Sequence, residues 1–105
     1  MVKNDTSKYQ VKSSKIHGKG TFARQTLNKN EDIGVGIDFY LGCLPFVTSE
    51  FASMINHSYC PNCYLRYKNG KWYVSASKQI QEGDEILLDY RKTPWYIMGP
   101  EAHYK

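Results

Sequence analysis

The stretch FASMINHSYCPNCYL, residues 51–65, decides how this chain folds. Its first apolar run ends at Ile55, and the polar run 56–58 follows directly, before a Pro61-Asn62 pair that two cysteines frame. Three interpretations account for so many hydrogen-bonding groups beside an apolar stretch: a metal site, an ordinary turn, or a backbone crossing that builds a ligand pocket. A crossing would bury backbone amides, and short polar side chains are suitable partners for such amides.

The spacing of His57, Cys60 and Cys63 is compatible with zinc, and Cys43 could supply a fourth ligand. A structural zinc usually has two separated ligand pairs, whereas these three candidates lie within seven residues. We therefore expect no metal, and small buried thiols instead. A Cys60–His57 pair could act in nucleophilic catalysis, but no orienting acid or oxyanion loop accompanies it.

Composition places the chain among folded, non-membrane proteins. Its 105 residues predict one domain, and 41% apolar with 14% aromatic residues exclude a disordered chain. No run approaches the ~20 apolar residues that span a membrane, and the first residues lack the apolar segment of a signal peptide. We expect a cytosolic or nuclear protein. The odd count of three cysteines argues against a disulfide framework.

The net charge of +4 is distributed unevenly. Residues 1–30 hold seven Lys or Arg and one acid, whereas residues 31–65 hold four acids and no Lys or Arg. One interpretation is a basic N-terminal arm on a neutral body. The other is that the acidic middle faces a cationic substrate while the arm contacts an anionic partner. Asp38 and Glu50 could attract a basic substrate, although a solvated turn is the expected place of each.

Outward from the opening stretch, the pattern is mostly strands and turns. Asn69-Gly70 predicts a two-residue type I′ turn of a β-hairpin. Residues 51–55 could form one or two helical turns, with Thr48 or Ser49 as the N-cap. Residues 39–50 show no period, and the C-terminal tail is expected to be irregular but packed. The class is therefore all-β, with little helix and with short strands near residues 9–11, 21–23, 33–37, 64–68, 71–75 and 85–90.

Gly18 and Gly20 form a short glycine loop, which lets main-chain groups meet a ligand directly. The loop lacks the third glycine and the helix of a dinucleotide fold, and it is no P-loop. Three motifs occur in order: HGKGTFA at 17–23, NHSYCPN at 56–62 and GDEILLDY at 83–90. This ordered set resembles the SET domain, a family of S-adenosylmethionine-dependent protein lysine methyltransferases. The resemblance covers roughly residues 9–96, and the chain is most similar to the compact viral or phage-type members.

The resemblance implies a mostly β, SET-type (β-clip) fold of short strands with little helix. It implies a single minimal domain over residues 1–105, with its core at about 9–96 and a short tail at 97–105. In the family the C-terminal segment threads under a loop beside the Asn-His-Ser stretch and forms a pseudoknot. Ser58 and Asn62 would tie this crossing together, and Glu85 and Asp89 would be structural.

The resemblance also implies the cofactor, S-adenosylmethionine, and the residues around it. Main-chain groups of the glycine loop would face its methionine part, while Asn56 and His57 would hold its adenine and amino-acid ends. Trp95 could stack on the adenine or close the lysine channel, or it could cap the core with Tyr96. The implied cofactor-binding residues are His17, Gly18, Lys19, Gly20, Asn56, His57, Tyr90 and Trp95.

Tyr90 matches the catalytic tyrosine of the family, and its hydroxyl would orient the lysine amine and the methyl group. A phenol, whose pKa is near ~10, is poorly suited to act as a general base at neutral pH. A narrow aromatic channel would instead favour the neutral amine by desolvation. The implied channel residues are Phe39, Tyr40, Tyr90 and Trp95, with Phe46 as a further candidate.

The implied substrate is a histone or another basic, lysine-containing protein. Nucleic acid would be reached only indirectly, through chromatin, and no membrane contact is expected. Compact viral relatives are dimers, so a homodimer is one option, and the nucleus or cytoplasm of a host cell is the expected location. Two departures from the family pattern are a very short segment before Asn56 and the lack of a cysteine-rich zinc segment after the core. The aromatic tail 93–105 would then have to cover the cofactor.

Two alternatives stay open. One is a SET-like module that binds a partner or cofactor without transferring methyl groups; the presence of Tyr90 and both glycines argues against it. The other is a small basic β-domain that binds nucleic acid through a stacking surface. That surface would consist of Tyr64, Tyr67, Trp72 and Tyr73, with Lys68 and Lys71.

Overall fold

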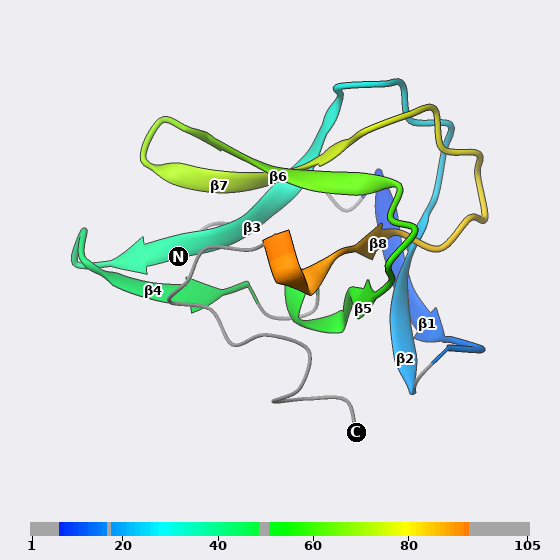
Figure 1. Cartoon of the computed structure of the whole chain (residues 1–105), viewed down its shortest axis with the longest axis horizontal. Helices are drawn as coiled ribbons and strands as arrows, with labels where there is room; N and C mark the ends of the chain where they lie inside the picture. Colours follow the sequence, from blue (N-terminus) through cyan, green and yellow to red (C-terminus); the bar gives the residue numbers. More distant parts are fainter. Residues whose placement is uncertain (1–6, 17, 49–50, 93–105) are drawn as a thin grey trace.

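The computed structural model describes residues 7–16, 18–48 and 51–92 of the chain. Within them, short strands form three small sheets, and helix is limited to two 3-10 turns (Figure 1). The elements are β1 Tyr9–Ser13, β2 Lys19–Ala23, β3 Asp32–Tyr40, β4 Leu44–Val47, η1 Ala52–Met54, β5 Asn56–His57, β6 Cys63–Lys68, β7 Lys71–Ala76, β8 Leu87–Leu88 and η2 Tyr90–Lys92. This mostly β architecture confirms the predicted fold class. No helix among the described residues is long and apolar enough to span a membrane.

The largest sheet has the strand order β4-β3-β7-β6, with antiparallel neighbours throughout. Strands β6 and β7 form the predicted hairpin, and Asn69 and Gly70 have φ of +52° and +76°, as a type I′ turn requires. Strand β3 contributes the buried side chains of Ile33, Val35 and Ile37. Its register with β7 shifts twice, so the strand bends as it crosses the sheet.

The main core cluster joins residues of β1, β2, β3, β6, β7 and β8 with residues of the segments between elements. Phe51 is fully buried just before η1, and its ring contacts that of Tyr9 with 4.3 Å between the centroids. Thr21 is also fully buried, and its hydroxyl donates to the Phe51 carbonyl at 2.8 Å. Burial of a side chain such as Phe51 stabilises a fold by about 1.5–3 kcal/mol. Besides Tyr9 and Phe51, the members of the cluster are Ala23, Leu27, Ile33, Ile55, Cys63, Val74, Ala76, Ile80, Ile86 and Leu88.

Two segments that are far apart in the sequence meet in the parallel pair β5–β8, drawn side by side in Figure 1. Asn56 pairs with Leu87 and His57 with Leu88, and the Ser58 N–H donates to the Leu88 carbonyl at 2.9 Å. Parallel strands cannot be joined by a tight turn, so this pair depends on all the structure between them. The pseudoknot implied by the family resemblance stays a prediction.

The structure differs from the sequence-based expectations in three places. Strand β4 lies in the stretch 39–50, where all four of its residues are exposed and no alternating pattern marks it. The stretch 51–55 forms only η1, and the Thr48 hydroxyl donates to the Val35 carbonyl at 2.7 Å instead of capping a helix. Of the predicted strand 85–90, only β8 is strand. Ser49 and the tail from residue 93 lie outside the described residues.

Candidate functional site

The glycine loop, the Asn56 segment and the segment after Gly83 come together at one place. The side-chain amide of Asn56 donates to Oε2 of Glu85 at 2.8 Å and to the Lys19 carbonyl at 3.3 Å. Gly20 lies against the same carboxylate: a Cβ at this position would overlap Oε2 and lie 2.9 Å from Cδ of Glu85. A side chain at position 20 would therefore prevent this approach. The three sequence motifs are in direct contact.

Ser14, which belongs to none of the three motifs, joins this contact. Its hydroxyl lies 2.8 and 2.9 Å from the two carboxylate oxygens of Glu85, and it accepts from Asn56 Nδ2 at 3.1 Å. It also accepts the Ile16 N–H at 3.0 Å, while the Ser14 N–H donates to the Gly18 carbonyl at 2.8 Å. The sequence held no signal for this role, because a serine in a polar loop usually lies free at the surface.

Asn62 ties the turn after β5 to the C-terminal segment. Its Nδ2 donates to the Glu85 carbonyl at 2.8 Å, and its Oδ1 accepts the Leu87 N–H at 2.8 Å. One amide side chain thus satisfies two main-chain groups that flank Ile86, which is fully buried. These two hydrogen bonds join the turn after β5 to the C-terminal segment, and the role of Asn62 in a pseudoknot stays a prediction.

Tyr90 begins η2 and contacts the Asn56 segment through both its side chain and its backbone. Its hydroxyl donates to the main-chain carbonyl of Ile55, the residue before Asn56. Its N–H donates to Nδ1 of His57 at 3.0 Å, and the two ring centroids lie 5.2 Å apart. These contacts hold the phenol oxygen at a defined position beside β5.

Asp89 and Arg91 flank Tyr90 and bind each other. The Arg91 guanidinium donates from Nε to Oδ1 at 2.9 Å and from Nη2 to Oδ2 at 2.6 Å. These hydrogen bonds lower the pKa of Asp89 to about 2, although burial of the carboxylate opposes the shift. The guanidinium also lies over the Tyr59 ring at 4.3 Å, and Asp89 Oδ1 lies 4.0 Å from Nδ1 of His57. The ion pair thus links the two segments that form β5 and β8.

Several predicted site residues do not take part in this contact. Gly18 has φ +47°, and no other described part of the chain lies within 4 Å of its Cβ position, so the loop is open there. Phe39 and Tyr40 end β3, whose tip lies far from η2 in Figure 1. Their place in a substrate channel stays a prediction. His17 and Trp95 lie outside the described residues.

Glu31 and Asp32, two of the four acids in the middle of the chain, are paired within the molecule, and Glu50 lies outside the described residues. Glu31 lies 3.1 Å from Nζ of Lys8, and Asp32 binds Arg66 at 2.7 Å and also Lys68. Burial raises the pKa of Asp32, but hydrogen bonds, led by that from Lys68, outweigh it and lower the pKa to about 2. The negative charges of these two carboxylates are therefore paired with cations of this chain.

The aromatic residues of the β6–β7 hairpin do not form one surface. Cross-strand partners share a face of an antiparallel pair, and successive residues alternate between faces. Tyr67 pairs with Trp72, with ring centroids 5.2 Å apart, whereas Tyr73 pairs with Arg66 on the opposite face. Tyr64, two residues from Arg66, lies on that second face. The predicted stacking surface is divided between the two faces.

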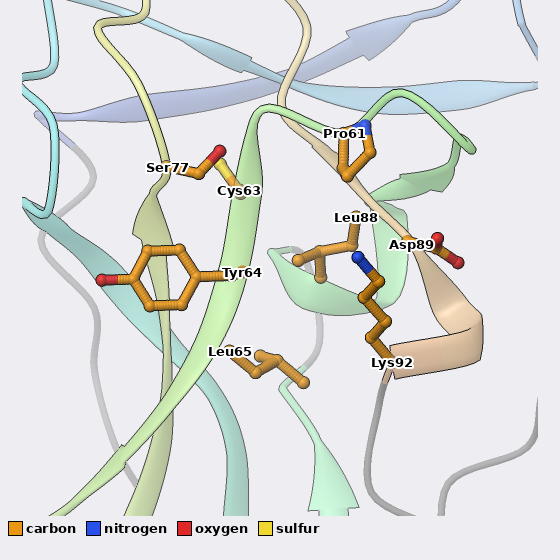
Figure 2. A pocket seen from close by; sticks show the side chains of 8 residues that line it. All are labelled: Pro61, Cys63, Tyr64, Leu65, Ser77, Leu88, Asp89 and Lys92. Atoms are coloured by element: carbon orange, nitrogen blue, oxygen red, sulfur yellow. The ribbon is translucent and has the colours of Figure 1, made fainter.

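A pocket of about 320 Å³ lies between β6 and the C-terminal segment (Figure 2). Leu65 and Leu88 border it, and the Lys92 side chain extends along it from η2. Burial raises the pKa of the Cys63 thiol, at its wall, to about 12. Among the described residues, its lining includes neither the glycine loop nor Tyr90, so it is distinct from the contact above. The lining residues are Pro61, Cys63, Tyr64, Leu65, Ser77, Leu88, Asp89 and Lys92.

The three cysteines are free thiols. The expectation of buried thiols holds for Cys63 and is wrong for Cys43 and Cys60, which are exposed. Within residues 7–16, 18–48 and 51–92, no group of three His, Cys, Asp or Glu side chains is arranged to hold a metal ion. The His57 ring instead contacts Tyr59 edge-on, with 4.3 Å between the centroids. A metal site therefore has no support from these residues.

The family model described as the SET domain matches residues 7–91. A Plasmodium falciparum structure, described as that of a candidate histone methyltransferase, has a TM-score of 0.64 and 23% identity, and the match covers 91% of this chain and 100% of that chain. The humanized mutant of the Chaetomium thermophilum Polycomb Repressive Complex 2, bound to the inhibitor GSK126, has a TM-score of 0.59 and 19% identity over 82% of this chain and 15% of that chain. At these identities the likeness concerns the fold. No curated protein sequence gave a significant match.

Proposed function

This chain belongs to the SET domain family, and from that premise we propose that it is an S-adenosylmethionine-dependent protein lysine N-methyltransferase. Proteins of this family are generally methyltransferases. The observation that carries the proposal is the meeting of the glycine loop, the Asn56 segment and the segment that ends at Tyr90. No other part of the described chain gathers the sequence motifs in this way.

The residues at this contact fit S-adenosylmethionine. Gly18 and Lys19 are exposed, and the space around the Gly18 Cβ position is open, so main-chain groups there can meet a ligand. When bound, S-adenosylmethionine supplies a sulfonium methyl group for transfer to a nucleophile. The chain would hold it by Gly18, Lys19, Gly20, Asn56 and His57, with His17 and Trp95 as further candidates.

Tyr90 would orient the lysine amine. Its hydroxyl donates to the Ile55 carbonyl, which fixes the direction of the O–H bond, and a phenol oxygen is also an acceptor. An acceptor beside the amine draws an N–H toward itself and turns the nitrogen lone pair toward the methyl group. In-line transfer depends on such positioning. The amine must also be neutral although lysine has a pKa near ~10.4, and exclusion of water around it favours that form.

Transfer of a labelled methyl group to a panel of histones tests the proposal. For Tyr90→Phe we expect kcat to fall by about 10²-fold, the loss typical of one transition-state hydrogen bond. Donor affinity, measured by calorimetry, separates the two roles implied for Tyr90: an affinity within about twofold of wild type assigns the phenol to the amine, and a larger loss assigns it to the cofactor. Tyr67→Phe removes an exposed hydroxyl on the hairpin and serves as the control.

Each result of these measurements separates one hypothesis from another. A Tyr90→Phe enzyme as fast as wild type would remove Tyr90 from the mechanism. A wild-type protein that binds no donor would end the cofactor assignment. Donor binding without transfer to any protein would support the inactive SET-like module. Salt-dependent binding of DNA or RNA, without donor binding, would support the nucleic-acid domain.

The substrate that we propose is a histone or another basic protein. Support comes from the two structural neighbours, one described as a candidate histone methyltransferase and one as a Polycomb complex. Because Glu31 and Asp32 are paired with cations of this chain, attraction of a basic substrate does not rest on them. We also propose that the chain is a compact member of the family, of viral or phage type, and that its C-terminal segment forms the pseudoknot. We propose that the protein is located in the nucleus or cytoplasm and forms a homodimer. Analytical ultracentrifugation tests the dimer.

A further inference from the structure

Ser14 closes the loop that carries the glycines. Its N–H donates to the Gly18 carbonyl at 2.8 Å across the neck of the loop, and its hydroxyl accepts the Ile16 N–H within the loop at 3.0 Å. Strand β2 begins at Lys19, directly after this neck. Ser14 therefore fixes the main chain of the loop at Ile16 and Gly18, while Lys19 pairs with Ser13 and its carbonyl accepts from Asn56.

The Ser14 hydroxyl also connects this loop to Asn56. It donates to the Glu85 carboxylate at 2.8 Å and accepts from Asn56 Nδ2 at 3.1 Å, while Asn56 donates to the same carboxylate at 2.8 Å. Serine, carboxylate and amide thus form a closed triangle in which each side chain bonds both others. Gly20 completes the packing, because its Cβ position lies 3.0 Å from Cβ of Ser14.

We propose that Ser14 is a positioning residue for the methyl donor: through Glu85 it holds the glycine loop and Asn56 in the arrangement that binds S-adenosylmethionine. This inference rests on the function proposed above and extends it, because no motif or family resemblance assigns a role to Ser14. A loop that is ordered before binding does not have to be ordered by the ligand, so affinity is gained without new contacts. The transfer step itself would not involve Ser14.

The experiment compares Ser14→Ala, Glu85→Gln and the double variant with wild type, and Ser13→Ala serves as the matched control. Ser13 is the adjacent, exposed residue at the end of β1. For Ser14→Ala we expect the donor Kd by calorimetry and the donor KM to rise about tenfold, with kcat at saturating donor within about twofold of wild type. Glu85→Gln should act in the same direction, because its NH₂ group would face that of Asn56.

The double variant tests whether the two residues act as one unit. We expect its donor affinity to be close to that of Ser14→Ala, because once the triangle is broken a second break changes little. Ser14→Thr keeps the hydroxyl and should keep most of the affinity. If Ser14→Ala does not fold, the donor affinities of Ser14→Thr and Glu85→Gln test the inference in its place.

Several results would overturn the inference. A lower Tm for Ser14→Ala with unchanged donor Kd and KM would show that Ser14 has a structural role only. If the losses of donor affinity in the two single variants add up in the double variant, Ser14 and Glu85 do not act as one unit. If wild type binds donor and Ser14→Ala binds it equally well, this inference alone fails. If wild type binds no donor, the proposed function fails and this inference fails with it.

Discussion

Gly20 has no Cβ, and the Glu85 carboxylate occupies the place where one would be. For Gly20→Ala we expect a loss of about 1–3 kcal/mol in the free energy of unfolding, as for other overpacked positions. Donor binding should become too weak to measure, because the displaced carboxylate would no longer hold Asn56. Urea unfolding and donor titration measure the two effects.

Gly18→Asn is the matched control for that change. Gly18 has φ +47°, which Asn adopts more readily than other side chains, and its Cβ position is open. We expect its stability to lie within about 0.5 kcal/mol of wild type. Equal stability of the Gly20 and Gly18 variants would contradict the tight contact at Gly20.

The three thiols differ in burial, and this predicts their reactivity. Cys43 and Cys60 are exposed, whereas burial raises the pKa of Cys63 to about 12. A thiol reacts as the thiolate, so at pH 8 we expect Ellman's reagent to modify two thiols quickly and the third only after unfolding in urea. Cys63→Ser should remove the slow phase. Three fast thiols in the folded protein would show that Cys63 is accessible.

At the scale of elements, two turns with nearly the same pair of positive φ angles carry different residues. Leu41 and Gly42, before β4, have φ of +54° and +76°, and Asn69 and Gly70 have nearly the same values. A positive φ is unfavourable for leucine and tolerated by asparagine. We therefore expect Leu41→Asn to raise the free energy of unfolding by about 0.5–1 kcal/mol and Asn69→Leu to lower it by a similar amount. The urea midpoints measure both, and an unchanged midpoint for Leu41→Asn would argue against strain there.

These turns also show which elements a sequence reveals. Asn69-Gly70 is a local signal, so the β6–β7 hairpin was predicted and is confirmed. β4 has no such signal, because a leucine stands in its turn and its own residues are exposed. The strand expected at 85–90 is short because the chain bends into η2 where Asp89 and Arg91 bind each other.

The residues of the candidate site also fall into two groups, those that a local sequence motif reveals and those that it does not. The glycine loop and the Asn-His-Ser segment could be recognised in the sequence, because each of their positions accepts few residue types. The hydroxyl of Ser14 and the guanidinium of Arg91 act only through partners that tertiary structure brings to them. Nothing local to either residue distinguishes it from an ordinary surface side chain.

At the scale of the whole molecule, Asp32 joins β3 to β6, to β7 and to the segment before β1. Its carboxylate binds Arg66 and Ser75, at 2.7 and 2.5 Å, and its carbonyl accepts from Lys8 Nζ at 2.8 Å. Its pKa is lowered to about 2, so the stabilisation is complete above the unfolded pKa of ~3.9 and is lost as the pH falls toward 2. Because the side chain is partly exposed, we expect about 1–2 kcal/mol.

Asp32→Asn isolates this contribution, since the variant keeps the shape of the side chain and cannot titrate. The difference in unfolding free energy between wild type and variant should narrow by about 1–2 kcal/mol between pH 6 and pH 2. Urea unfolding at a series of pH values measures it. A difference that stays constant with pH would mean that the carboxylate gains nothing from its cations.

Because Asn56 pairs with Leu87, the site cannot form until the ribosome has made the C-terminal part of the chain. During synthesis, the glycine loop and the Asn-His-Ser run leave the ribosome well before the strand that completes them, so the nascent chain carries two of the three parts without their partner. Bringing β5 and β8 together closes the long loop between them. This delays folding, because the loop loses conformational entropy before the contacts between the two strands form. Until residues 85–90 arrive, Ser14 and Asn56 lack the Glu85 carboxylate, and Asn62 lacks the two main-chain groups that it binds.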